Sequence, residues 1–335
     1  MNGIGGTSIN AALNQLKPLP RLADPIGQPE RLTRIAQAQY FMREQGMAAL
    51  WLDASTSLTY FTGLSFGRSE RLHGAVLLQS GPPLYVSPAF EVEKLLTMIS
   101  VEGEIIQWDE HDSPTLIVMN ALRARGVSGP MGLDELTPFF TSEGFRRAAD
   151  RFELVEGAAV TAACRMHKTP QEIALMQRAM DSTLLVHKAA ASILHEGITT
   201  SEVQAFLHEA HRRMGFSKLL FDIVLFGPPT AYPHGVPYPQ TLAKGDMVLI
   251  DVGGELDGYL SDITRTFIFG DATARQKQIW NLEKAAQQAV FAAAQLGVAC
   301  SALDDAARSV VTAAGFGPDY NVPGLPHRAG HGIGL

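Results

Sequence analysis

The stretch GDMVLIDVGGELDGYLSDITRTFIFG, from Gly245 to Gly270, decides the fold of the second half of the chain. It contains two apolar runs, 247–252 and 259–269, joined by the glycine-rich segment 253–258. Apolar runs of this length on either side of a glycine-rich turn are typical of a β-hairpin. The stretch therefore predicts two neighbouring antiparallel strands.

Each predicted strand carries one carboxylate, Asp251 in the first and Asp262 in the second. Burying an ionised carboxylate costs several kcal/mol unless a cation or tight hydrogen bonding compensates it. A hairpin can bring both side chains within a few ångströms, where their charges repel unless a metal ion lies between them. Acidic residues are also common in turns, so spacing alone leaves both a metal site and solvated strand ends open.

Two histidines flank the hairpin in loops rich in glycine and proline: His234 in GPPTAYPHGVP (227–237) and His331 in GHGIGL (330–335). Four elements then stand in order, namely PHG at 233–235, DVG at 251–253, GYLSDITRT at 258–266 and GHGIG at 330–334. In order and spacing they resemble the pita-bread metallopeptidases, in particular Xaa-Pro dipeptidase (prolidase) and aminopeptidase P.

This resemblance implies an α+β protein in which an N-terminal α/β domain, similar to that of creatinase, precedes a pita-bread catalytic domain. We expect an N-terminal arm at 1–28, the α/β domain at 29–160 and the catalytic domain at 161–335. The resemblance is strong from Arg165 onward and looser before it. The family's two later glutamate ligands have no counterpart up to Leu335, so the pita-bread domain is expected to be C-terminally incomplete.

The resemblance also implies a site for two divalent metal ions. Asp251 is expected to bind one ion, Asp262 to bridge both and His331 to bind the second. Oxygen and imidazole ligands suit Mn²⁺, Co²⁺, Zn²⁺ or Fe²⁺, of which we expect Mn²⁺. Glycines on both sides of His331 allow the backbone to approach closely, which favours a ligand role.

Further roles are implied around these ligands. His234 and His327 are the expected catalytic histidines, His234 hydrogen-bonding the scissile carbonyl and His327 lining the substrate side. A turn histidine at 234 and an exposed side chain at 327 are the alternatives. Thr264 is expected to hydrogen-bond a metal carboxylate, and Arg265 to form a structural ion pair.

The regular elements are expected from periodicity and turn signals. Helices are expected at 29–46, 91–99, 113–125, 142–150, 169–194, 200–214, 272–296 and 301–314, the last capped by Ser301. Strands are expected at 47–52, 72–78, 83–86, 104–108, 131–133 and 152–155, with a further one in 216–226. His208 and His211 are expected at the surface, and Arg68 or Arg71 is a candidate for meeting a substrate carboxylate.

Composition narrows the partners. The 335 residues carry a net charge of −7, which argues against a nucleic-acid or anionic-membrane surface. Two cysteines in unrelated contexts give no disulfide framework, and without a secretory signal we expect a cytoplasmic protein.

The resemblance implies a homodimer that hydrolyses the bond before proline in an Xaa-Pro dipeptide. An Xaa-Pro aminopeptidase, or a non-peptidase member of the lyase, creatinase-like or metal-poor binding type, remains the alternative.

A chain of only these 335 residues should bind metal singly and weakly and be catalytically inactive. Fewer anionic ligands leave the repulsion between two cations poorly screened. Calorimetric titration with Mn²⁺, run beside a Gly-Pro hydrolysis assay, measures both properties. Tight binding of two ions per chain, or efficient turnover, would show that other groups replace the glutamates.

Overall fold

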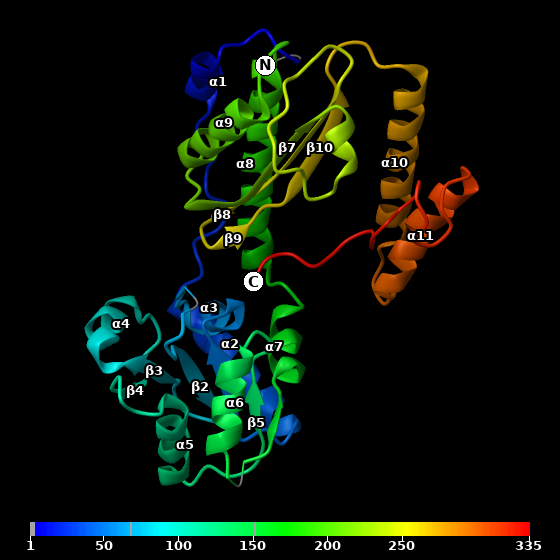
Figure 1. Ribbon diagram of the computed structural model, residues 1–335. Coiled ribbons are helices and arrows are strands. Elements are labelled where there is room, and N and C mark those ends of the chain that lie inside the picture. Colours follow the sequence, from blue (N-terminus) through cyan, green and yellow to red (C-terminus); the bar gives the residue numbers. More distant parts are fainter. Residues whose placement is uncertain (1–3, 68, 151) are drawn as a thin grey trace. The chain divides into compact units, whose positions relative to one another are not determined.

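The computed structural model describes residues 4–67, 69–150 and 152–335, and the chain forms two compact units (Figure 1). One unit is Arg21–Leu175. The other combines the residues up to Pro20 with Met176–Gly334. The limits expected from sequence, 1–28, 29–160 and 161–335, stay predictions.

The unit 21–175 contains a six-stranded mixed sheet in the order β4-β3-β2-β1-β5-β6. Its strands are β1 (Ala49–Asp53), β2 (Gly74–Leu78), β3 (Leu84–Pro88), β4 (Glu104–Trp108), β5 (Met131–Leu133) and β6 (Leu154–Glu156). Its helices are α2 (Gln28–Glu44), α3 (Thr56–Thr62), η1 (Ala89–Glu91), α4 (Val92–Met98), α5 (Pro114–Ala124), α6 (Phe139–Ala148) and α7 (Ala158–Arg165). Central strand β1 is buried at every position, as expected for a strand covered by helices.

A buried ion pair ties helix α2 to the start of helix α8 (Pro170–Ile193). Arg34 Nη2 lies 3.3 Å from Glu172 Oε1, and the two side chains are 3% and 0% exposed. Arg34 also donates to the Tyr60 carbonyl, and Glu172 accepts from the backbone N–H of the helix cap Thr169. Because each charge has several partners, the pair compensates much of its desolvation cost.

The second unit contains a smaller antiparallel sheet in the order β10-β8-β7, with β9 also paired to β8. Its strands are β7 (Lys218–Phe226), β8 (Met247–Leu256), β9 (Tyr259–Leu260) and β10 (Ile263–Ile268). Its helices are α1 (Ile9–Gln15), α8 from Met176 onward, α9 (Thr200–Arg213), η2 (Pro228–Ala231), α10 (Ala274–Ala293) and α11 (Cys300–Ala313).

Helices α8 and α9 cover one face of this sheet (Figure 1). Alternate residues of β8, namely Val248, Ile250 and Val252, are fully buried in a core shared with both helices. Side chains alternate along a strand, so Leu249 and Asp251 point to the opposite face. That face is the side on which the expected metal ligand lies.

The hairpin is confirmed, but its turn is shorter than the expected 253–258. Strand β8 continues to Leu256, and the chain reverses at Asp257 and Gly258, whose φ angles of 51° and 82° fit a type I′ turn. The second strand is also not continuous over 259–269. It breaks at Ser261 and Asp262, between β9 and β10.

The segment expected as an N-terminal arm contains helix α1, and Arg178 of α8 donates to the Leu19 carbonyl from Nε and Nη2 at 3.1 and 3.0 Å. The cap expected for helix α11 was wrong. Helix α11 begins at Cys300 after Ala299, with no side-chain cap, so Ser301 is not its N-cap. Helices α3 and α7 were not expected, because short apolar helices resemble strands in a sequence pattern.

Helix α10 is joined to the sheet by polar contacts near its start. Trp280 Nε1 donates to the Thr266 carbonyl of β10 at 3.0 Å, and Gln276 Nε2 donates to the Gly245 carbonyl at 3.0 Å. Thr273 forms a capping box with Gln276, which fixes the first turn. No helix in the described part of the chain is both long and apolar enough to cross a bilayer.

Glu172→Gln should lower the free energy of unfolding by about 3 kcal/mol, because it leaves the buried Arg34 guanidinium without its main counter-charge. Urea unfolding monitored by circular dichroism measures the loss. Glu209→Gln, which breaks exposed contacts to Arg212 and Arg213, is the control and should cost less than about 1 kcal/mol. Equal effects in the two variants would contradict a structural role for the buried pair.

Candidate metal centre

The two aspartates lie diagonally across the β8–β10 ladder. In the observed register Thr264 is the residue opposite Asp251, and Asp262 lies just before β10, in the break after β9. A residue two positions from the directly opposed one remains on the same face and close enough for long side chains to interact. The repulsion of Asp262 acts on the Asp251 carboxyl, which places the two charges near each other.

Asp251 is held in a partly dry environment. Burial, followed by the nearby Asp262 charge, raises its pKa, while a hydrogen bond from the Thr264 side chain and the charges of His234 and His331 lower it. Its Oδ1 atom is buried and has no hydrogen-bond partner among the described residues. An anionic oxygen of this kind is the ligand that a hard divalent cation requires.

His331 approaches the other carboxylate. Its Nε2 atom lies 3.4 Å from Asp262 Oδ2, and its Nδ1 atom lies 2.8 Å from the Gly332 carbonyl oxygen. Because a carbonyl only accepts, Nδ1 carries the proton of a neutral ring and Nε2 then presents a lone pair. A lone pair directed at a carboxylate oxygen suits a cation shared between them.

The other two expected histidines lie differently. His234 is exposed in the loop after η2, and its charge reaches Asp251. His327 is exposed and turns its Nδ1 towards the Arg328 carbonyl at 2.7 Å, while Arg308 of α11 binds the carbonyl of His327 itself at 2.9 Å. The structure thus brings His331, but not His327, against an aspartate.

The ligand set does not close around one point. Among the described residues, no three His, Cys, Asp or Glu side chains converge closely enough to hold one metal ion. The structure brings Asp262 together with His331, and Asp251 near Asp262. The metal roles of these residues stay predictions.

Asp262 and His331 line a pocket of about 410 Å³, together with Thr264, Arg265 and Gln287. Arg265 Nη1 donates to the carbonyl of Thr264 at 2.7 Å. It forms no ion pair within the described part of the chain, so the expected structural ion pair of Arg265 is not formed. A positively charged side chain therefore remains at the pocket wall.

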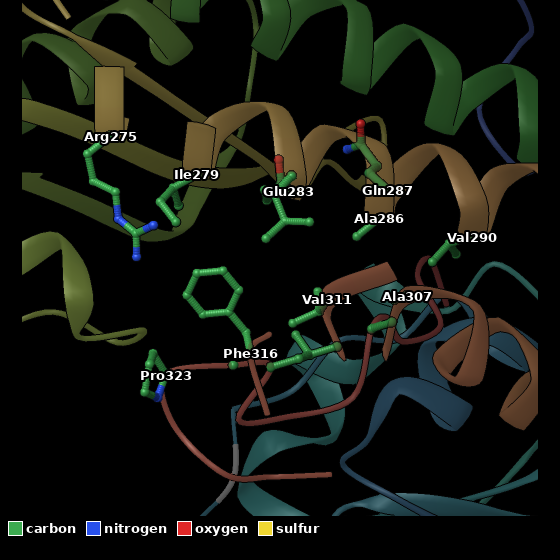
Figure 2. Close-up of a pocket in the computed structure, with 14 residues that line it drawn as sticks. Arg275, Ile279, Glu283, Ala286, Gln287, Val290, Ala307, Val311, Phe316 and Pro323 are labelled. Carbon is green, nitrogen blue, oxygen red and sulfur yellow. The ribbon is translucent and has the colours of Figure 1, made fainter. Parts of the chain in front are cut away.

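A second pocket, of about 540 Å³, lies between α10 and α11 (Figure 2). Its wall is mainly apolar, with Ile279, Val290, Val311 and Phe316 among the lining residues. Burial raises the pKa of Glu283, a further residue of this wall. Neither aspartate nor His331 lines it, but Gln287 lines both pockets, so the two pockets adjoin.

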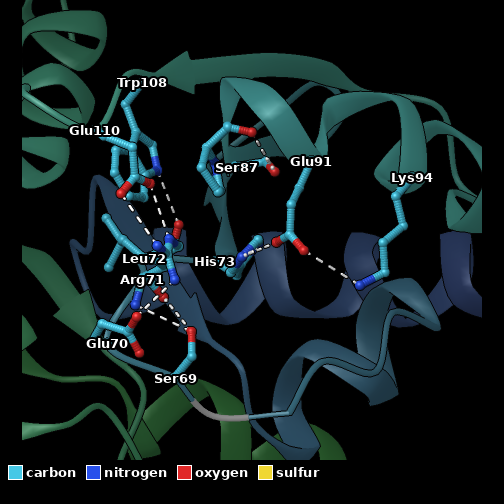
Figure 3. A network of polar contacts seen from close by, with 11 residues as sticks. Ser69, Glu70, Arg71, Leu72, His73, Ser87, Glu91, Lys94, Trp108 and Glu110 are labelled. Carbon is cyan, nitrogen blue, oxygen red and sulfur yellow. Dashed lines mark hydrogen bonds and ion pairs between the residues drawn. The ribbon is translucent and has the colours of Figure 1, made fainter.

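Arg71 is part of a polar network in the unit 21–175 (Figure 3). Its guanidinium binds both carboxylate oxygens of Glu110 at 3.0 and 3.2 Å and contacts Glu70 at 2.7 Å. These two carboxylates neutralise the charge expected to meet a substrate. The other candidate, Arg68, lies outside the described residues.

Sequence reasoning placed His211 at the surface, and this was wrong. His211 is 1% exposed, and burial lowers its pKa to about 4. His208, three positions earlier, is exposed and pairs with Asp222 at 3.1 Å. His187 of α8 is also buried, with its pKa lowered to about 4 by burial, and no motif singled it out. A signal was available in the helical spacing of His187 with Thr183, which places both on one face.

Comparison with known proteins identifies the family. Residues 34–167 match the model of the creatinase/prolidase N-terminal domain, and residues 174–335 match that of metallopeptidase family M24. A Bacillus subtilis protein named "Putative dipeptidase YkvY" is 32% identical over 307 residues, which make up 91% of this chain and 83% of that protein. The chain belongs to metallopeptidase family M24.

Solved structures agree with this assignment to family M24. The crystal structure of dipeptidase PepE from Mycobacterium ulcerans superposes with a TM-score of 0.83 at 30% identity, over 93% of this chain and 82% of that one. A prolidase from Thermococcus sibiricus has the same fold, with a TM-score of 0.81 at 24% identity over 91% and 82%. The expected family and the expected order, a creatinase-like domain before a pita-bread domain, are confirmed.

Asp251→Asn should stabilise the metal-free protein more at pH 7 than at pH 4. A carboxyl whose folded pKa is raised contributes stability below its unfolded pKa, near 3.8, and loses it as pH rises. The amide carries no charge and escapes this loss. Unfolding free energies of both proteins in chelator, at the two pH values, measure the difference.

The control is Asp305→Asn, because the Asp305 side chain is exposed on α11. Its effect on stability should be small at both pH values. A larger gain for Asp251→Asn at pH 4 than at pH 7 would contradict the burial of an ionised carboxylate.

Proposed function

We propose that this M24 metallopeptidase hydrolyses the peptide bond before proline in Xaa-Pro dipeptides, using two divalent metal ions, with Mn²⁺ as the first choice. The observation that carries the proposal is the buried, unpartnered Oδ1 of Asp251 beside Asp262 and His331. The names of its relatives support a dipeptidase, and those of several fold neighbours support action before proline.

The residues present fit a metal pair in charge and donor type. In the proposal Asp251 binds one ion, Asp262 bridges both and His331 binds the second. Two carboxylates and an imidazole form the mixed oxygen and nitrogen set that Mn²⁺, Co²⁺ and Zn²⁺ accept. The cation would also remove the repulsion that raises the pKa of Asp251.

Residues around the metal ligands would orient those ligands and bind the substrate. Bound divalent metals supply a water of lowered pKa and stabilise negative charge on the attacked carbonyl oxygen. Thr264 holds the Asp251 carboxylate by a hydrogen bond, which fixes the direction of the ligand. His234, exposed near Asp251, would donate a hydrogen bond to the scissile carbonyl, and His327 stays a candidate for the substrate side.

Substrate size and state of assembly also belong to the proposal. Arg265 leaves a cation at the wall of the pocket beside the site, where the carboxylate of a dipeptide would be attracted. An Xaa-Pro aminopeptidase remains the alternative, since the ligands do not select substrate length. We further propose a cytoplasmic homodimer with no nucleic-acid or membrane partner.

Protein that carries both metal ions should cleave Gly-Pro and related Xaa-Pro dipeptides faster than Xaa-Pro-Xaa tripeptides or Xaa-Ala dipeptides. A panel of these peptides assayed with Mn²⁺, Co²⁺ and Zn²⁺ decides the matter. Faster cleavage of the tripeptides would favour the aminopeptidase. Equal cleavage of Xaa-Ala and Xaa-Pro would remove the proline requirement, and no cleavage by protein that binds two ions would exclude the peptidase proposal.

Asp262→Asn should lower any measurable turnover at least about 100-fold while the protein still folds. The change removes the proposed bridging charge and conserves shape, and each 1.4 kcal/mol lost from the transition state costs tenfold in rate. Elemental analysis should show a parallel loss of bound metal. Asp222→Asn, which alters a half-buried carboxylate of β7 paired with His208, is the control. Wild-type metal content in Asp262→Asn would show that Asp262 is not a ligand.

A further inference from the structure

Asp262 lies at a point where the sheet does not hold the backbone by a regular ladder. Strand β9 ends at Leu260, and β10 begins at Ile263. The residues on either side of Asp262 are nevertheless buried, with Ser261 1% and Ile263 9% exposed. The Ser261 N–H donates to the Gly254 carbonyl of β8 at 2.9 Å, and side-chain contacts add to this bond.

Helix α8 supplies two of these contacts, one on each side of Asp262. Thr183 Oγ1 lies 2.7 Å from Ser261 Oγ, and His187 Nε2 lies 2.9 Å from the Ile263 carbonyl oxygen. Thr183 and His187 are separated by about one helical turn, so their side chains share a face. The helix thus holds the segment through a side chain before Asp262 and a carbonyl after it.

The contact partner defines the tautomer of His187. A carbonyl oxygen only accepts, so Nε2 must carry the proton that it donates to Ile263. Nδ1 is buried and has no partner among the described residues. The ring therefore has one donor, and that donor is used on the peptide group between Ile263 and Thr264, one peptide beyond the one that follows Asp262.

Helix α9 completes the network behind Thr183. His211 Nδ1 lies 2.9 Å from the Leu207 carbonyl, so it carries the proton, and Nε2 is an acceptor 3.4 Å from Thr183 Oγ1. At that length the contact is weak. If the Thr183 hydroxyl donates to His211, it accepts from Ser261, whose Oγ also accepts the Gly254 N–H at 3.2 Å. With these donor and acceptor roles, a chain of hydrogen bonds connects α9 through α8 to the segment between β9 and β10.

Ordinary core packing does not require this arrangement. Two buried histidines carry a desolvation cost that apolar side chains of similar size would avoid. Burial lowers the pKa of both rings to about 4, so they remain neutral and exert no charge on the nearby carboxylates. His187 binds Ile263 directly, and His211 reaches Ser261 only through Thr183. Ser261 and Ile263 are the two neighbours of one proposed ligand.

We propose that His187, backed by Thr183 and His211, is a positioning residue that fixes the backbone just after Asp262 and so directs the Asp262 carboxylate towards the metal ions. The proposal rests on the function proposed above. His187 touches neither Asp262 nor the pocket, and it acts through the Ile263 carbonyl. Loss of the hydrogen bond leaves the segment free to rotate the carboxylate away from His331.

The test compares two substitutions at His187. Gln reaches a similar distance and keeps an N–H donor, whereas Leu fills much of the same space and removes it. Ser192→Ala is the control on α8, because it deletes a buried hydrogen bond, 2.8 Å to the Ala189 carbonyl, at a position beyond His187 on the same helix. Electron paramagnetic resonance of free Mn²⁺ gives the affinity of each variant, including weak affinities, and urea unfolding in chelator gives its stability.

His187→Leu should lower Mn²⁺ affinity about 10-fold or more, as loss of a group that orients a metal ligand does. His187→Gln should stay within about threefold of wild type, and Ser192→Ala should lose stability without losing affinity. Unchanged affinity in His187→Leu would overturn the proposal, as would affinity losses that follow stability equally in all three variants.

The two proposals fail separately. Wild-type protein that binds Mn²⁺ but cleaves no Xaa-Pro peptide overturns the proposed substrate, while the affinity comparison still decides the role of His187. Cleavage that persists in His187→Leu with unchanged affinity overturns only the positioning role. A wild-type protein that binds neither Mn²⁺, Co²⁺ nor Zn²⁺ overturns both.

Discussion

Strand β8 is hydrogen-bonded to β7 on one side and to β10 on the other, and this double pairing fixes where the carboxylates stand. One face of the strand packs against α8 and α9 in the core. A one-residue slip of the register would turn Val248, Ile250 and Val252 out of that core and Asp251 into it. The hydrophobic pattern therefore holds the acidic face of the sheet in place.

The chain accepts an unfavourable electrostatic arrangement on that face. Burial and the charge of Asp262 both oppose ionisation of Asp251, and one buried oxygen has no hydrogen-bond partner among the described residues. Groups held in an environment that disfavours their charged form are concentrated at functional sites. Here the conflict would be relieved by a cation, which is the chemistry of family M24.

The sequence allowed the motif residues to be recognised because their chemistry conflicts with their surroundings. An aspartate inside an apolar strand, and a histidine between glycines, are both visible without a structure. The order of the domains followed from the resemblance of the four motifs to one family, and most helices and strands followed from periodicity. Strand Glu104–Trp108 and strand Met131–Leu133 have the expected limits.

The remaining features depend on tertiary contacts that a sequence pattern does not contain. His211 looks like a surface histidine because neighbouring positions of α9 are polar, and only its packing against Phe216 and Leu207 buries it. His327 and His331 lie four positions apart in one segment, and both are exposed. They differ because Arg308 binds the chain at His327, whereas the chain at His331 reaches Asp262.

The contact of Trp280 with β10 gives the molecule a natural optical probe. The chain has three tryptophans, and Trp51 and Trp108 are buried in the unit 21–175. Trp280 belongs to the other unit, is 42% exposed and has Lys284 over its ring. Buried indoles emit at shorter wavelengths than hydrated ones, so the emission spectrum separates the two units. Its long-wavelength component reports whether α10 stays attached to the edge of the sheet that carries the aspartates.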